Sequence, residues 1–225
     1  MDKTATTKRN CHPLRWFWTL CVLLALLTAG GVFLCRQSPR AYQPRPVEKP
    51  EQVSLYLTHQ LGPDFYNQVQ LDEPFELRVQ QDGLNDILRN WPWPQKAGNV
   101  AFSDPVVLFE EQVIYLMGTL EYKGISTILT IIASPVIDAE GNLSLNIDSI
   151  WLGKLPAKTL ITNLAQYAFQ QSLPEFENEP QLEEIVRSII YGQAFNSTFE
   201  ISGRHVKVTQ ITLESKLLTL QFDPE

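Results

Sequence analysis

Residues 113–133, VIYLMGTLEYKGISTILTIIA, decide the fold class of this chain. Two long runs rich in β-branched and aromatic residues flank Lys123-Gly124, and this pattern is typical of antiparallel strands joined by a tight turn. Both runs carry apolar side chains at alternating and at intervening positions, so both faces of each strand are apolar. We therefore expect a sheet that helices cover on one side or that curls around something.

The strand pattern continues on both sides of this hairpin. We expect a meander from Val100 to Trp151, with a further hairpin loop at residues 138–142 in which Gly141 takes a positive φ. Apolar residues at helical spacing predict two helices after Pro156, the second of which stops at Gly192. Antiparallel strands with segregated helices predict an α+β fold: a long curved antiparallel sheet packed with two or three amphipathic helices and preceded by one transmembrane helix.

Shorter elements complete the prediction. A helix over about residues 53–61 is expected to end before Gly62-Pro63, and residues 75–80 alternate as a half-buried strand. Gln81-Asp82-Gly83 breaks that alternation, and a second short helix then runs to about Asn90. Near the C-terminus, Phe195 to Ile201 reads as one strand, residues 202–205 as a turn, and the remaining apolar positions as a final ribbon.

The uncharged segment Trp16 to Cys35 predicts a membrane anchor. Twenty residues at about 1.5 Å each match the roughly 30 Å hydrocarbon core of a bilayer. A cleaved signal peptide is the main alternative, but apolar Val32, Phe33 and Leu34 follow the small residues where cleavage would fall. A buried core helix is the remaining alternative. The predicted organisation is a short cytoplasmic tail at 1–15, the anchor at 16–35, a Pro-rich spacer at 36–50 that lifts the domain off the bilayer, and a soluble domain at 51–225.

The flanking charges give no positive-inside bias. Lys3, Lys8, Arg9 and Arg15 precede the anchor, and four basic residues also follow it before residue 50. The basic N-terminal tail is similar to the first part of a signal-anchor, so we expect the domain to be extracytoplasmic in a single-pass cell-membrane protein.

Charge and cysteine content exclude several functions. Residues 50–225 contain ten Lys or Arg and 23 acidic residues, and this net charge near −13 argues against binding nucleic acid through bulk electrostatics. Cys11, Cys21 and Cys35 all lie in the N-terminal region, so the domain has neither a disulfide framework nor a thiolate metal site. His59 and His205 stand alone, and no nucleophile elbow or phosphate loop is present. We expect no catalysis, no metal and no cofactor.

Two sets of residues are candidate binding sites. Apolar stripes on the two later helices would line a groove for a lipid or other apolar ligand, or would simply form a closed core; the stripe residues are Ile161, Leu164, Phe169, Leu182, Ile185 and Ile189. Trp91-Pro92-Trp93-Pro94 would contact the membrane or a partner, or would cap the core beside the preceding helix. The acidic run around Glu177 is a further candidate surface for a partner.

Several short motifs resemble the YpmS-like family of bacterial membrane-anchored proteins of unknown function. The resembling features are the single N-terminal span and the segments Leu84-Asn85-Asp86-Ile87-Leu88, Tyr122-Lys123-Gly124, residues 138–141, and Leu152-Gly153-Lys154-Leu155-Pro156. A looser similarity is to tubular lipid-binding domains, whose curved sheet wraps a helix around an apolar groove. The strands with two apolar faces and the two apolar helical stripes, in a domain without catalytic groups, predict a non-catalytic module that binds a lipid or other apolar ligand near the membrane. The alternative is a cell-envelope scaffold or assembly protein that acts through protein contacts.

Overall fold

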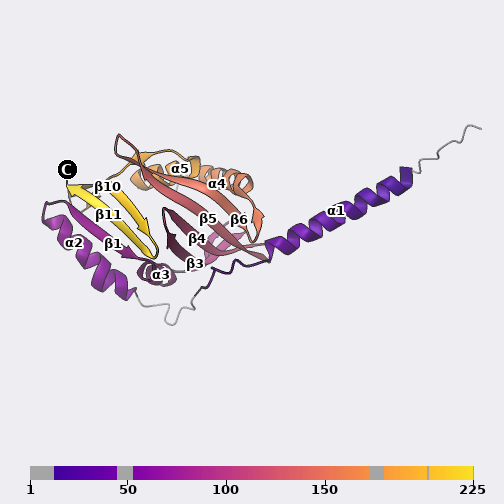
Figure 1. Cartoon of the computed structure of the whole chain (residues 1–225), viewed down its shortest axis with the longest axis horizontal. Coiled ribbons are helices and arrows are strands. Elements are labelled where there is room, and N and C mark those ends of the chain that lie inside the picture. The colour runs from indigo at the N-terminus through magenta and orange to yellow at the C-terminus, as the bar shows by residue number, and fades with distance from the viewer. Residues whose placement is uncertain (1–12, 45–52, 173–179, 202, 225) are drawn as a thin grey trace, which may run out of the picture.

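The computed structural model describes residues 13–44, 53–172, 180–201 and 203–224. It confirms the α+β fold, with antiparallel sheets, packed helices and one long apolar helix near the N-terminus. That helix, α1 (Pro13–Cys35), projects away from the rest of the molecule (Figure 1). The predicted N-terminal tail lies outside the described residues as far as residue 12.

Helix α1 is the one described helix that is long and apolar enough to cross a membrane. The qualifying stretch is Trp16–Cys35, with a mean hydropathy of 2.2, and none of it is buried against the domain. Charged side chains are absent from these twenty residues, so water is a poor solvent for the exposed helix surface. This finding agrees with the predicted single span.

The larger sheet contains the meander that residues 113–133 predict. Its strand order is β2-β3-β4-β5-β6-β7, and β8 pairs with β6 off this path. All the pairs are antiparallel, and the turn at Lys123-Gly124 and the loop at residues 138–142 lie where expected. Its strands are β2 (Gln95–Ala97), β3 (Val100–Glu110), β4 (Val113–Tyr122), β5 (Ile125–Ile137), β6 (Asn142–Leu152), β7 (Leu155–Pro156) and β8 (Phe195–Asn196).

A smaller sheet has the order β1-β11-β10-β9. A bulge in β10 at Thr209 keeps its apolar side chains on one face, because Val206 and Val208 lie on one side of the extra residue and Ile211 on the other. Without the bulge, Ile211 would point to the opposite face. The strands are β1 (Phe75–Gln80), β9 (Thr198–Ile201), β10 (Arg204–Glu214) and β11 (Leu217–Pro224).

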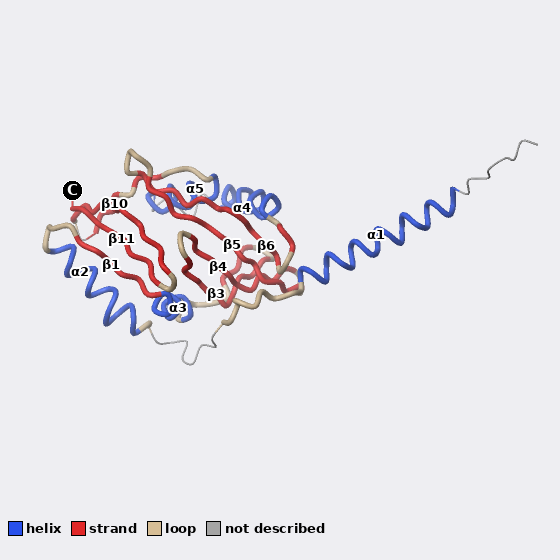
Figure 2. Tube along the Cα trace, viewed as in Figure 1, coloured by secondary structure: helices blue, strands red, loops and turns tan. Residues whose placement is uncertain are grey.

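Helices pack against both sheets (Figure 2). The π-helical turn η1 (Leu57–Leu61) leads into α2 (Gly62–Gln70), which packs on the smaller sheet. The ring of Phe65 on α2 contacts Phe222 at a centroid distance of 5.4 Å, and Phe222 stacks on Phe75 at 5.0 Å. Helix α3 (Gln81–Arg89) follows β1 directly, and α4 (Lys158–Ser172) and α5 (Pro180–Tyr191) pack against β6.

Three boundaries differ from the predictions. The helix expected to end before Gly62-Pro63 instead continues to Gln70, because the wider π turn lets Gly62 N–H donate to Leu57 O and leaves Pro63 in the first turn of α2. Helix α3 begins at Gln81 rather than after Gly83. The expected turn at residues 202–205 is shorter, since β10 already begins at Arg204.

The expected strand from Phe195 to Ile201 is divided at Ser197. Phe195 pairs with Leu143 in the larger sheet, whereas the residues after Ser197 pair with β10 in the smaller sheet. Ser197 is fully buried; its hydroxyl donates to Gly141 O at 2.7 Å, and its carbonyl accepts from Val208 N at 3.0 Å. The chain therefore changes sheets at this residue, and the periodicity of the apolar positions does not reveal the change.

The segment after the anchor, residues 36–44, crosses the larger sheet instead of separating it from α1. At the end of α1, Leu34 O accepts from Lys154 N at 3.0 Å and Cys35 O accepts from the Thr127 hydroxyl at 2.6 Å. Further on, the Tyr42 hydroxyl contacts the Thr119 hydroxyl at 2.9 Å. The expected spacer therefore does not lift the domain here; residues 45–50 of that spacer fall in the undescribed range 45–52.

Candidate functional site

A cleft of about 710 Å³ lies between the connecting segment 36–44, helix α3 and strand β3. We call it the Trp91 cleft. Its lining combines aromatic and proline residues with carboxylates, amides and two cations, among them Ala41, Pro44, Gln81, Asn85, Asp86, Arg89, Trp91, Trp93, Asp104, Leu108 and Lys216. Concave sites of this size with a few convergent polar groups are the usual form of ligand sites in proteins.

Two side chains of α3 form one wall of the cleft by pairing with the main chain of β3. The Asn85 amide donates to Val107 O at 2.8 Å and accepts from Val107 N at 2.7 Å, and the Gln81 side chain accepts from Phe109 N at 2.8 Å. The separation of Gln81 and Asn85 along the helix matches that of Phe109 and Val107 along the strand, because four helical residues rise about 6 Å and two strand residues about 6.6 Å. The helix thus occupies hydrogen-bonding groups that an open strand edge would leave unpaired.

The same junction joins the two sheets. Lys216, in the turn between β10 and β11, donates its N–H to Phe109 O at 3.1 Å and accepts from Gln81 N at 3.0 Å. Lys216 has a φ of 66°, a left-handed backbone conformation that is unfavourable for residues other than glycine. Main-chain bonds from Gln81 and Phe109 hold it there, so the floor of the cleft is fixed by residues far apart in the sequence.

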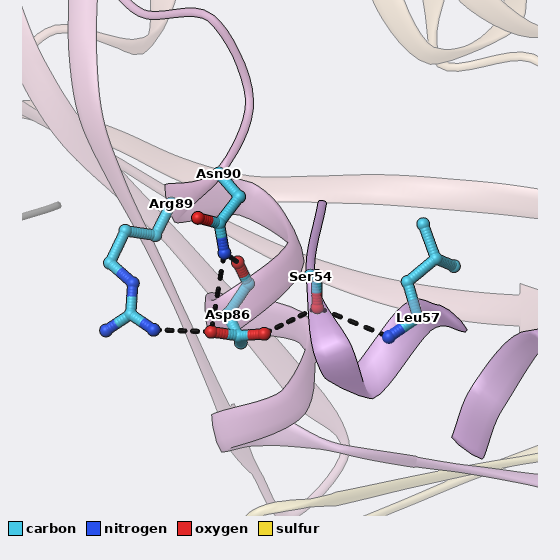
Figure 3. A network of polar contacts seen from close by, with 5 residues as sticks. All are labelled: Ser54, Leu57, Asp86, Arg89 and Asn90. Atoms are coloured by element: carbon cyan, nitrogen blue, oxygen red, sulfur yellow. Dashed lines mark hydrogen bonds and ion pairs between the residues drawn. The ribbon is translucent and has the colours of Figure 1, made fainter. Parts of the chain in front are cut away.

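Asp86 centres a polar network at the outer end of α3 (Figure 3). The buried Ser54 hydroxyl donates to one carboxylate oxygen at 2.5 Å, and Arg89 and Asn90 approach the other oxygen. The hydrogen bond from Ser54 lowers the pKa of the Asp86 carboxyl, and Arg89 adds to this effect against the opposing effect of partial burial. Ser54 also accepts from Leu57 N, so the network ties η1 to α3.

The two tryptophans of the 91–94 loop have different roles. Trp93 donates its ring N–H to Leu88 O at 2.6 Å and packs edge-on against Phe102 with a centroid distance of 5.7 Å. Trp91 is 59% exposed beside the cleft. Trp93 therefore caps the core beside the preceding helix, which was the alternative prediction for this loop. Trp91 stays a candidate contact residue. Contact of either residue with a membrane or partner stays a prediction.

A second hollow of about 500 Å³ adjoins the first, since Ala41 and Leu108 line both. It adds Tyr115 and the exposed carboxylates of Glu110 and Glu111. The Trp91 cleft and this hollow together follow the path along which residues 41–44 cross the sheet. The two hollows together offer a ring face, hydrogen-bonding groups and apolar contacts.

The six predicted groove residues lie elsewhere, on α4 and α5. Phe169 is buried and packs edge-on against Tyr191, Ile161, Ile185 and Ile189 are half-buried, and Leu164 and Leu182 are exposed. None of the six lines either hollow described above. Their role as an apolar-ligand groove stays a prediction. Glu177, the centre of the other candidate surface, lies outside the described residues.

Possible metal ligands are also dispersed in the described part of the chain, where no group of three or more His, Cys, Asp or Glu side chains converges. Asp138 is an example: its carboxylate accepts from Asn142 N at 2.7 Å and closes the hairpin loop that contains Gly141 (φ 82°). These main-chain hydrogen bonds lower the pKa of Asp138.

Sequence reasoning missed Gln81, Asn85 and Ser54 as residues that build the site. A signal was present, because Gln81 and Asn85 stand four residues apart directly after a strand and so share one face of the helix. Comparisons with known proteins add no identification: no family model, no curated protein and no solved structure matches the chain. The resemblance to the YpmS-like family accordingly stays a prediction.

Proposed function

We propose that this chain is a single-pass membrane protein whose extracytoplasmic domain is a non-catalytic binding module of the cell envelope. The bound partner is an extended, proline-containing segment of another protein. It lies in the Trp91 cleft. The observation that carries the proposal is this cleft, which is lined by the exposed Trp91 and by Ala41, Gln43 and Pro44 of the chain's own connecting segment.

The lining favours a polypeptide over a lipid chain. Aromatic grooves that bind proline-rich segments use stiff ring faces, which cost a pre-extended ligand little conformational entropy on binding. Trp91, Pro92, Trp93 and Pro94 line this cleft together with Pro44, and such stiff ring surfaces suit contact with a proline-containing backbone. Charged side chains such as Lys216 and Asp104 also line it, and an acyl chain would remove water from them without offering hydrogen bonds in return.

Co-purification from native membranes tests the proposal. Full-length chain, Trp91→Ala and a control Tyr66→Ala are crosslinked in intact cells, and the captured proteins are quantified. Tyr66 is also exposed but lies on α2, away from the cleft lining. We expect one protein in stoichiometric amounts with the unaltered chain and with the control, and a loss of at least several-fold with Trp91→Ala. Equal capture by both variants would refute a role for the cleft.

A lipid or other apolar ligand held at α4 and α5 is the second candidate. Leu160, Leu164 and Tyr167 share one face of α4 and are all exposed, and such an apolar row is unusual on a helix that only closes a core. Native mass spectrometry of the gently extracted full chain is the test. Co-purifying lipid that Leu164→Asn removes supports this candidate, and a lipid-free chain refutes it.

The orientation completes the proposal. The basic tail Lys3, Lys8, Arg9 and Arg15 supports a cytoplasmic N-terminus, as in a signal-anchor. Protease added outside intact spheroplasts is expected to digest the domain and leave an N-terminal tag protected. Digestion of the tag alone would reverse the assignment.

A further inference from the structure

The end of the larger sheet that adjoins α1 carries exposed apolar and cationic side chains. Tyr122 and Ile125 flank the turn between β4 and β5 and are 47% and 59% exposed. Lys123 lies between them in the sequence, and its ammonium group sits 5.3 Å from the centre of the Tyr122 ring. An aromatic ring, a branched aliphatic chain and a lysine together form the type of surface that favours the interface of a bilayer.

Hydrogen bonds fix this turn beside the end of the anchor. Thr127 of β5 donates to Cys35 O, and Lys154 N in the next turn donates to Leu34 O. Gly153 is required at this contact, since a Cβ there would overlap the main chain of Leu34 and Cys35. The view in Figure 2 agrees, with strand ends next to the last turn of α1.

The distances place the turn at membrane depth. If Trp16–Cys35 spans the hydrocarbon core, Cys35 lies at its boundary, and the headgroup layer beyond is about 5 to 8 Å thick. Ile125 is two strand residues from Thr127, which is about 7 Å. The turn therefore lies within roughly 15 Å of Cys35, in the headgroup layer or directly next to it.

The charge at this end contrasts with the acidic domain. Lys96 of β2, Lys123 and Lys154 lie in or next to the turns at this end, and Arg36 follows the anchor directly. Glu121 is the acidic residue at the same end of β4. Among the described residues near this end, these four cations outnumber the carboxylates of Glu121 and Asp104. This favours an anionic lipid surface, whereas the rest of the domain is repelled by one.

We propose that the turn at residues 122–125 is a second membrane contact, which places Tyr122 and Ile125 in the headgroup layer and Lys123 against anionic lipid phosphates. The inference rests on the proposed membrane anchoring by α1. Two attachment points would fix the tilt of the domain over the bilayer and hold its long axis in one direction relative to the membrane surface.

Fluorescence quenching in reconstituted bilayers tests this contact. Full-length chain with Cys11, Cys21 and Cys35 replaced by Ser receives one labelled cysteine through Ile125→Cys, Val136→Cys or Leu24→Cys. The bilayers contain phosphatidylcholine and phosphatidylglycerol with a headgroup or acyl-chain quencher. Val136 is the matched control, because it is exposed on the same strand but roughly 35 Å from Ile125.

The three labels separate the outcomes. We expect quenching by the acyl-chain probe at position 24, and headgroup quenching at position 125 that is several-fold stronger than at 136 and falls when Lys123→Glu is added. Quenching at 24 with no difference between 125 and 136 would overturn the second contact and leave the anchor intact. Absence of quenching at 24 would overturn the anchor and the second contact with it.

Discussion

Replacing Asn85 by Ala removes the side chain that pairs α3 with β3. Both main-chain groups of Val107 lose their partner, and Val107 is only 6% exposed, so water replaces these bonds poorly. A buried donor or acceptor without a partner costs about 1–3 kcal/mol, so the loss of both partners in Asn85→Ala should lower the free energy of unfolding by about 2–6 kcal/mol. At about 2–4 °C per kcal/mol for a domain of this size, the midpoint should fall by roughly 5–25 °C.

Thermal and urea unfolding of the full chain in a mild detergent measure this effect. The fluorescence of Trp93 reports on the junction between α3 and β3, because its ring N–H is hydrogen-bonded to Leu88 of α3. Asn67→Ala is the control, since Asn67 is exposed on α2 and its removal should change stability by less than about 0.5 kcal/mol. A loss for Asn85→Ala no larger than that of the control would refute the edge-capping role of Asn85.

Three further predictions follow from neighbouring residues. Gly83→Ala should destabilise the chain by about 1–3 kcal/mol in urea unfolding, because the added Cβ overlaps the Tyr56 ring, whereas helix propensity alone would predict a gain. Trp91→Ala should leave the unfolding midpoint unchanged, while Trp93→Ala should cost about 2–3 kcal/mol, less than a fully buried aromatic because Trp93 is half-buried; equal effects would contradict their different packing. Because the pKa of Asp86 is lowered in the folded state, its ionised carboxylate stabilises the fold at pH values above the ordinary pKa of 3.8. This contribution is lost as the pH falls through the folded pKa, so D86N should make stability less dependent on pH in that range, as measured by acid unfolding.

Local patterns predicted most of the elements. The alternation of residues 75–80, the turn at Lys123-Gly124 and the positive φ of Gly141 depend on neighbours in the chain, and the structure confirms all three. The passage of a helix through Gly62-Pro63 was missed, because a π turn is not visible in apolar spacing.

The cleft was beyond sequence reasoning for a different reason. Its walls come from residues 41–44, α3, the 91–94 loop, β3 and the turn at Lys216, and tertiary contacts alone bring these segments together. Tyr42 and Thr119, for example, are 77 residues apart and meet through their hydroxyls. The change of sheet at Ser197 is hidden in the same way, since both strand fragments have an ordinary strand composition.

Site-specific photocrosslinking in intact cells tests the central claim, that a membrane-held domain binds a protein segment in the Trp91 cleft. A photoreactive amino acid replaces Trp91 in the full chain, and Tyr66 in the control. We predict a discrete crosslinked protein from position 91, absent from position 66 and mapped by mass spectrometry to an extended, proline-containing segment. Identical background labelling from the two positions would contradict the claim.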